Sequence, residues 1–273
     1  EAARKGAAAA LIIHDTEGAS YGWDVVKNSW SGPQYDLPAK DDPAPRVPAQ
    51  GWITGEAATA LFKAAGQDLA KLRAAANKRG FKPVPLDATA SLDLKSSSVE
   101  KSSRNVIGLL PGSETPDEAI VYMAHWDHLG THDGEAGDNI YNGAVDNATG
   151  VAAILELAEA FRKAKTPPKR SILFLAVTLE ESSLLGSKYY VAHPVVPLDK
   201  TVAVVNLDAL APIGKARDIT VVGKGSSQLE DVLKSVLDSQ QRTAVGEENT
   251  AAGYYFRSDH FNFAKAGVPA LYI

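Results

Sequence analysis

From about residue 104 onward, short apolar runs alternate with segments whose apolar residues recur at helical spacing. The runs consist almost entirely of Val, Ile, Leu and Ala, which is typical of strands buried on both faces. Such alternation predicts an α/β domain with three layers, in which helices cover both faces of a mostly parallel sheet. The expected strands span residues 105–110, 119–124, 171–178, 202–207, 219–222 and 268–273, and the expected helices span residues 150–163, 183–191 and 227–240.

The first hundred residues have a weaker pattern, which predicts a smaller α+β unit. Strands are expected at residues 9–13 and 50–54, and a helix at residues 55–69. Residues 21–48 are rich in Trp, Pro, Gly and Asp and indicate a long loop, whose aromatic side chains favour cover of a small core over a ligand site. Residues 86–100 alternate weakly, as an exposed strand pair would. No promising site lies in this part, and the pattern changes at about residue 103.

Length and composition set further limits. A chain of 273 residues can form one large or two ordinary domains, and 45% hydrophobic with 22% charged residues is the balance of a globular protein. The net charge of −5 comes without a basic stripe, which argues against nucleic acid as a partner, and no apolar run reaches membrane-spanning length. Cysteine is absent, so a metal ion would have to be held by His, Asp and Glu.

The most informative stretch is His125-Trp126-Asp127, which follows the apolar run at residues 119–124. Side chains two residues apart on a strand point to the same face, so His125 and Asp127 are expected side by side. A carboxylate at the second ring nitrogen is a frequent partner of a histidine that binds a metal ion. The alternative is an ordinary strand that runs into a polar loop, because His-x-Asp is common by accident.

Acidic residues follow two further expected strands. Glu180 and Glu181 come after one, and Asp208 ends another. Asp146 stands in a loop rich in Gly and Asn before a helix, where the alternative role is an N-cap; Asn147 is also available for that role. Sites gather at the carboxyl ends of parallel strands, so these carboxylates are expected at the same edge of the sheet as the histidine.

Four or more carboxylates at one edge repel one another unless a cation neutralises them. Histidine with carboxylates and no thiolate suits zinc, and manganese or cobalt are candidate substitutes. The sequence therefore predicts a divalent metal site. The motifs that carry it, in chain order, are His125-Trp126-Asp127-His128, Gly143-Ala144-Val145-Asp146-Asn147, Glu180-Glu181 with Leu185-Gly186-Ser187, Asn206-Leu207-Asp208 and Ser258-Asp259-His260 with Phe263.

Together these motifs resemble the co-catalytic di-zinc aminopeptidase family, which includes secreted bacterial leucyl aminopeptidases and glutamate carboxypeptidase. The resemblance implies a zinc-exopeptidase fold for residues 103–273, incomplete at its C-terminal end. Residues 1–102 resemble the protease-associated domain found near the start of many family members, incomplete at its N-terminal end. Both ends of the chain are thus expected to be cut.

The resemblance implies a role for each matching residue. His125 and Asp208 would hold one zinc ion, Glu181 would hold the other, and Asp146 would bridge the two. The family also has a cis peptide bond after its bridging aspartate, which implies one at Asp146–Asn147.

Further roles follow from the same resemblance. Asp127 would orient the histidine ligand, and Glu180 would act as general base and then as general acid. Tyr255, Asp259 and His260 are assigned to substrate binding, with Tyr255 lining the pocket.

The fifth ligand of the family is not matched in this chain. From the residues alone His260 is the obvious candidate, but the family's fifth ligand is a histidine expected beyond Ile273. The second zinc site is therefore expected to be incomplete. His128, His132 and His193 are interpreted as non-ligands.

The implied function is a metal-dependent exopeptidase, an aminopeptidase that releases N-terminal residues through a water shared by two zinc ions. Peptides with a free N-terminus are the expected partners, and an extracytoplasmic location, periplasmic or secreted, is implied. Three alternatives stay open: a single-zinc acyltransferase of the glutaminyl cyclase type, a catalytically inactive receptor-like binding protein on the same scaffold, and a truncated chain that is inactive although its parent is an enzyme.

Overall fold

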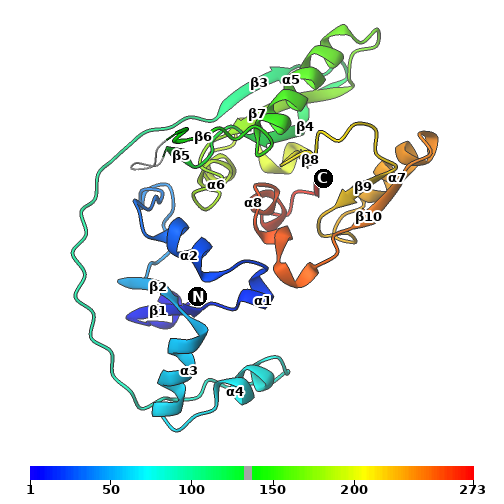
Figure 1. Ribbon diagram of the computed structural model, residues 1–273. Helices are drawn as coiled ribbons and strands as arrows, with labels where there is room; N and C mark the ends of the chain where they lie inside the picture. The colour runs from blue at the N-terminus through cyan, green and yellow to red at the C-terminus, as the bar shows by residue number, and fades with distance from the viewer. Residues whose placement is uncertain (132–136) are drawn as a thin grey trace. The chain divides into compact units, whose positions relative to one another are not determined.

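The computed structural model describes residues 1–131 and 137–273 (Figure 1). The chain divides into two compact units, one made of Glu1–Pro33 with Pro43–Lys101 and the other of Gln34–Asp42 with Ser102–Ile273. The sequence did not indicate that a segment as early as Gln34–Asp42 belongs with the second unit. The assignment of the first unit to the protease-associated type stays a prediction.

The first unit is built on a short parallel pair of strands. β1 (Ala9–Ile13) and β2 (Ala49–Ile53) pair over their whole length, close to the expected positions. The other elements of this unit are η1 (Ala3–Lys5), α1 (Thr16–Ala19), α2 (Trp23–Trp30), α3 (Gly55–Ala64) and α4 (Leu69–Ala76).

The loop predicted for residues 21–48 is wrong in part, because α2 lies within it. Val26 on this helix is 3% exposed, and the Trp30 ring lies 6.1 Å from the Trp52 ring between centroids. The burial of Val26 and the contact of Trp30 with β2 therefore stabilise a helix that the local composition did not suggest.

The strand pair predicted for residues 86–100 is also wrong, since this stretch has no regular secondary structure. Its apolar side chains are exposed, including Leu94 at 68% and Val99 at 76%. A strand pair without a covered face gains too little from burial to offset the ordering of its backbone.

The second unit has a five-stranded sheet in the order β11-β8-β4-β7-β3. All neighbours are parallel except β3 against β7, which confirms the prediction of a mostly parallel sheet. The central strand β4 is the longest and ends at His125. The bounds are β3 (Val106–Leu110), β4 (Thr115–His125), β7 (Arg170–Val177), β8 (Thr201–Asn206) and β11 (Ala270–Tyr272).

Helices cover both faces of this sheet, so the three-layer prediction is confirmed. Met123 on β4 packs in the same cluster as Tyr190 and Phe263, which lie on α6 (Leu185–Ala192) and α8 (His260–Lys265). Ala124, its neighbour in sequence, faces the other side and packs with Ile154 of α5 (Ala148–Lys163). Successive strand residues therefore serve opposite layers, as the apolar runs predict.

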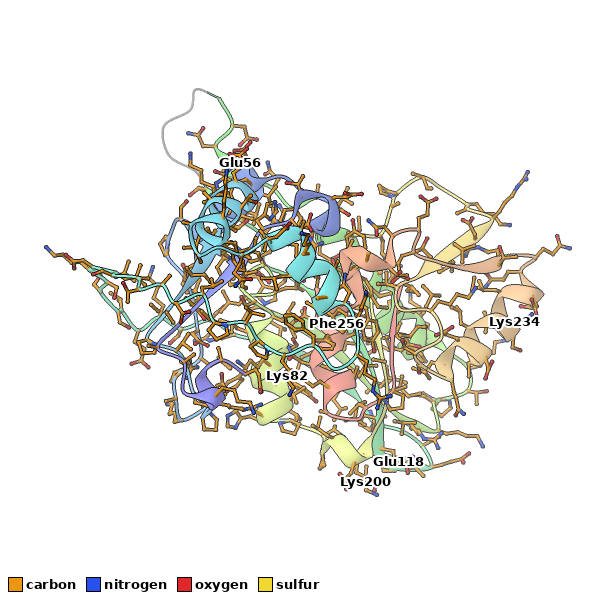
Figure 2. All side chains as sticks on the ribbon, turned by 90° about the horizontal axis from the view of Figure 1, so that it is seen from below. Glu56, Lys82, Glu118, Lys200, Lys234 and Phe256 are labelled. Carbon is orange, nitrogen blue, oxygen red and sulfur yellow. The ribbon has the colours of Figure 1, made fainter. Side chains whose placement is uncertain are left out.

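The expected strand at residues 219–222 does form, but it joins a separate sheet. β9 (Asp218–Val221) pairs in parallel with β10 (Thr243–Gly246), and a single bridge from Val222 to Tyr272 connects it to β11. α7 (Leu229–Ser239) packs beside this pair, and its outer face carries Lys234, paired with Asp238 at 2.6 Å (Figure 2).

The remaining short elements of the second unit are β5 (Gly130–Thr131), β6 (Ile140–Tyr141), η2 (Leu198–Lys200), η3 (Thr250–Ala252) and η4 (Tyr254–Phe256). Across the part of the chain that the structure describes, no helix has both the length and the apolar character that a bilayer crossing requires.

Candidate active site

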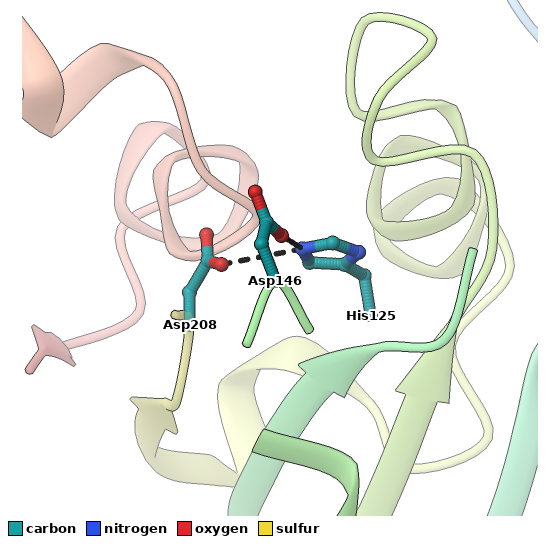
Figure 3. Close-up of side chains that lie close together, drawn as sticks. All are labelled: His125, Asp146 and Asp208. Atoms are coloured by element: carbon teal, nitrogen blue, oxygen red, sulfur yellow. Dashed lines mark hydrogen bonds and ion pairs between the residues drawn. The ribbon is translucent and has the colours of Figure 1, made fainter. Parts of the chain in front are cut away.

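The carboxyl ends of three neighbouring strands bring the predicted ligands together. β4 ends at His125, and Asp208 lies two residues beyond β8. The Nε2 atom of His125 lies 3.0 Å from Oδ1 of Asp146 and 3.2 Å from Oδ1 of Asp208 (Figure 3). These three side chains form a group whose ligand atoms all lie within 4.8 Å of one another. We call it the first group.

A second group shares Asp146 with the first. It consists of His128, Asp146 and Glu181, whose ligand atoms again lie within 4.8 Å of one another. The Nδ1 atom of His128 is 2.7 Å from Oε1 of Glu181. All four residues predicted as metal ligands therefore meet at one place, in the pairing that the resemblance implies.

Of the histidines predicted as non-ligands, two are described. His193 is paired with Asp41 at 3.2 Å and is 46% exposed. His128, in contrast, belongs to the second group, which the sequence did not suggest. His132 lies outside the described residues.

His125 is oriented by Asp127 in a way that differs from the prediction. The Nδ1 atom of His125 lies 3.0 Å from the backbone carbonyl oxygen of Asp127. A carbonyl can only accept, so Nδ1 donates and Nε2 is left to face the carboxylates of the first group. The Asp127 carboxylate is 3.7 Å from Nδ1 and accepts instead from the backbone N–H groups of Glu180, at 3.1 Å, and Glu181, at 3.3 Å. Asp127 thus connects the ends of β4 and β7.

Asp208 is held by Ser258, a role that the sequence analysis missed. Oδ2 of Asp208 accepts from the Ser258 hydroxyl at 2.6 Å, and that hydroxyl accepts from the Asn206 side-chain amide at 2.7 Å. Ser258 is 1% exposed. The only signal in the sequence was its place directly before Asp259 in a motif already singled out.

Asn147 connects the Asp146 loop to the end of β8. Its side-chain amide donates to the carbonyl of Leu207 at 2.9 Å, and its Oδ1 accepts from the N–H groups of Gly150 at 3.0 Å and Ala209 at 3.2 Å. Asn147 is thus the N-cap of α5, and the peptide bond that precedes it is cis, as the resemblance implies.

We expect Asn147→Ala to lower the free energy of unfolding by about 2–4 kcal/mol, because it removes a helix cap and leaves buried backbone groups without partners. Denaturant unfolding of the metal-free chain, followed by circular dichroism, measures this. Glu156→Ala, at an exposed position on the same helix, serves as the control and should cost less than about 1 kcal/mol. Equal losses for the two variants would contradict the role of Asn147.

The donor set fits a divalent cation. Within the described residues, no lysine or arginine is paired with Asp146, Asp208, Glu180 or Glu181. Oδ1 of Asp146 is shielded from solvent and makes no hydrogen bond of acceptable geometry, although it faces the imidazole of the first group. A buried carboxylate oxygen without a donor costs free energy unless a cation binds it.

The pKa values of His125 and Glu180 also reflect the excess of carboxylates over positively charged side chains at this site. Burial alone lowers the pKa of His125, but the close carboxylates of Asp127, Asp146 and Asp208 outweigh burial and raise the pKa far above its ordinary value. Burial, followed by the negative charge of Asp259, raises the pKa of Glu180 to about 9. Without a metal ion the site therefore retains protons at neutral pH.

Metal affinity is consequently expected to rise with pH. A metal ion must displace the proton of His125, whose raised pKa keeps it bound through the neutral range. Each proton displaced makes the apparent affinity rise about tenfold per pH unit below that pKa. Competition with a chelator of known affinity, at several values between about pH 6 and pH 8, measures the slope. A flat profile after correction for the chelator would show that no proton is displaced.

The residues predicted to bind substrate lie at different depths. Tyr255 is partly exposed, and its ring packs where a side chain at Gly223 would lie, with Cδ2 at 2.1 Å from the position of a Cβ. Asp259 and His260 are both 0% exposed, and the His260 ring lies between Tyr255 and Tyr272, at 4.9 and 4.7 Å between centroids. Both side chains are buried in this structure, and their contact with substrate stays a prediction.

Comparison with known proteins identifies the family. The model of peptidase family M28 matches residues 105–273, more than half of the chain. The aminopeptidase YwaD of Bacillus subtilis (strain 168) is 28% identical over 191 residues, which cover 66% of this chain and 37% of that protein. The mouse (Mus musculus) aminopeptidase NAALADL1 is 28% identical over 164 residues, covering 57% of this chain and 20% of that protein.

A solved structure shows the same fold. The crystal structure of LapB from Legionella pneumophila matches with a TM-score of 0.50 and 26% identity, covering 62% of this chain and 43% of that one. The chain thus spans only about a fifth to two fifths of the length of the curated relatives named above. The matched segment contains every strand end and loop that forms the two groups, and from residue 105 onward the chain belongs to peptidase family M28.

Proposed function

We propose that this chain carries the active site of a two-zinc aminopeptidase. The observation that supports it best is that two groups of one histidine and two carboxylates share Asp146. Such an arrangement suits two ions that act on one substrate, because a shared carboxylate keeps them close together. Membership of a peptidase family and the names of the relatives point to the same activity.

His125, Asp146 and Asp208 would hold one ion, and Asp146 with Glu181 would contribute to the other. The bound ions would supply positive charge to polarise a peptide carbonyl and to make a water molecule acidic at neutral pH. The protein keeps the ligands in place through the hydrogen bond that the Asp127 carbonyl accepts from His125 and the one that the Ser258 hydroxyl donates to Asp208.

Glu180 is the residue placed to move the proton. Its backbone N–H is fixed by the Asp127 carboxylate, and its side chain lies among the charges of the first group. Its pKa of about 9 without metal is that of a group shielded from water and short of positive charge. Nearby cations lower such a pKa toward the range in which a carboxylate takes a proton from water and passes it to the leaving amine.

Preference for a free N-terminus follows from the remaining negative charge. Asp208 belongs to the first group and Glu180 lies beside it, and an ammonium group is a suitable partner for carboxylates that the metal ions do not fully neutralise. A substrate whose amino group is blocked would lose this interaction. This supports release of single N-terminal residues rather than cleavage within a peptide.

The test compares metal content and turnover of the same preparation. We expect about two zinc ions per chain by elemental analysis and hydrolysis of leucyl anilide, lost with a chelator and restored by zinc. N-acetyl-leucyl anilide is the matched control and should not be cleaved. Equal cleavage of both substrates would overturn the exopeptidase assignment, and metal-independent cleavage would overturn the metal assignment.

The extracytoplasmic location implied by the resemblance is kept as part of this proposal. Secretion or periplasmic residence of the parent protein would be tested by fractionation of the cells that produce it. Recovery only with cytosolic markers would contradict it.

A further inference from the structure

We propose that Tyr141 contacts the second residue of the peptide substrate, the one that follows the scissile bond, and makes the enzyme prefer an apolar and above all an aromatic residue there. The inference rests on the proposed aminopeptidase function and deepens it. It concerns a part of the substrate that neither the motifs nor the family resemblance specify.

Exposed apolar side chains are concentrated in the stretch of chain between His125 and Asp146. Among its described residues, four large apolar side chains are between 45% and 57% exposed: Leu129, Ile140, Tyr141 and Val145. A single exposed apolar residue is ordinary, whereas several in one stretch are typical of a surface that binds something. Because this stretch begins and ends at candidate metal ligands, the peptide substrate is the occupant to consider.

Tyr141 lies directly beside the second group. Its ring meets the ring of His128 edge-on, with 6.5 Å between centroids. His128 in turn lies 2.7 Å from Glu181, measured from Nδ1 to Oε1, and shares the second group with Asp146. The Tyr141 side chain is 46% exposed, so part of its surface is open to a ligand next to the carboxylates of the site.

The loop around Tyr141 is held in place before substrate binds. On one side, the carboxylate of Asp138 accepts from the side-chain amide of Asn142 at 3.2 Å. On the other side, Gly143 has a φ of +63° and passes so close to His128 that a Cβ would lie 3.0 Å from the Cβ and Cγ of the histidine. A surface that is already ordered loses little entropy when a side chain packs against it.

The direction of the bound peptide follows from the proposed function. With the substrate's ammonium group near Asp208, the chain beyond the scissile bond extends past the shared Asp146 toward the second group. One extended residue advances about 3.3–3.6 Å, and its side chain reaches further. The side chain of the second residue is therefore within reach of Tyr141, whose ring lies beside this group.

The chemistry of the loop determines which side chain it favours. Packing an aromatic residue against the Tyr141 ring removes apolar surface from water, and two rings gain further from offset or edge-to-face contact. The carboxylate of Asp138 lies in the same loop and repels an acidic residue. We therefore expect phenylalanine to be favoured over glycine at the second position, and aspartate to be disfavoured.

The alternative role for Tyr141 is cover of the His128 ring, without contact to substrate. A structural role of this kind would change the turnover of all substrates by the same factor. A specificity role changes the ratio of kcat/KM between substrates that differ only in the second residue. The ratio therefore separates the two roles.

The experiment uses the full chain loaded with zinc and two substrates with the same first residue, leucyl-phenylalaninamide and leucyl-glycinamide. For the unaltered chain we expect kcat/KM to be about 10-fold higher for the phenylalanine substrate, the effect of partly burying one aromatic side chain. Tyr141→Ala should lower this ratio about fivefold or more, and Tyr141→Phe should preserve it within about twofold. Tyr141→Lys should raise kcat/KM for leucyl-aspartamide relative to leucyl-phenylalaninamide, because it places a positive charge where the ring was.

Tyr189→Ala is the matched control, since Tyr189 is a similarly exposed aromatic residue of the same unit, on α6. It should leave the ratio unchanged, and circular dichroism should show that every variant is folded. If Tyr141→Ala and Tyr141→Lys keep the ratios of the unaltered chain, the inference is overturned and the aminopeptidase function stands. If the unaltered chain cleaves neither substrate, the proposed function fails and the inference fails with it.

Discussion

Glu180→Gln is expected to lower kcat by about 10²–10⁴-fold, the usual contribution of a general base, while the metal content stays unchanged. Glutamine keeps the size of the side chain but cannot accept a proton from water at neutral pH. The hydrogen bond from the Glu180 backbone N–H to Asp127 does not depend on the side chain, so the position of the strand end is preserved.

The measurement is steady-state hydrolysis of leucyl anilide together with elemental analysis of the same sample. Glu156→Gln, at an exposed position on α5, is the matched control and should leave kcat within experimental error. Retained turnover in Glu180→Gln would show that Glu180 is not the general base. Loss of metal together with turnover would instead identify Glu180 as part of the metal shell.

The second large effect is expected for Asp146→Asn, which should lose both ions. Asp146 belongs to both groups, so its replacement removes a charge from each. Asp208→Asn, which touches only the first group, should lose one ion and leave the other bound. We expect the affinity lost in each case to exceed about 100-fold, the upper end of the cost of removing an outer-shell partner.

Titration of each variant with zinc, followed by elemental analysis, gives the number of ions retained. Asp231→Asn, on the exposed face of α7, is the control for the loss of one negative charge. Equal stoichiometry in Asp146→Asn and Asp208→Asn would show that Asp146 does not serve two ions, and the proposed function would have to be reduced to a single-ion reaction.

Several features of the fold follow from local sequence because their causes are local. A strand buried on both faces has to be apolar at every position, so residues 119–124 and 171–178 stand out in the chain. The order of strands and helices then limits the sheet to a few topologies, all of which place strand ends at one edge. That is why His125, Glu181 and Asp208 could be expected together before any coordinates.

Other features depend on contacts between distant segments. The burial of Val26 and the packing of Trp30 on Trp52 decide that α2 is a helix, although the composition around it is that of a loop. In the same way, residues 86–100 alternate as a strand would but have no covering partner. Local pattern is a weak guide wherever the free energy comes from a neighbour that is remote in sequence.

The features of the candidate site can likewise be separated into those predicted from the sequence and those seen only in the structure. By itself the sequence determined the α/β class, the mostly parallel sheet and the convergence of four candidate ligand residues, since each is marked by its place at a strand end or in a family motif. Only the tertiary structure decided that the backbone carbonyl of Asp127 orients His125, that Ser258 holds Asp208, and that His128 joins the second group. These three contacts are made by loops, and loops have no hydrophobic periodicity from which their course could be predicted. Their geometry is fixed by close packing between segments that are far apart in the sequence.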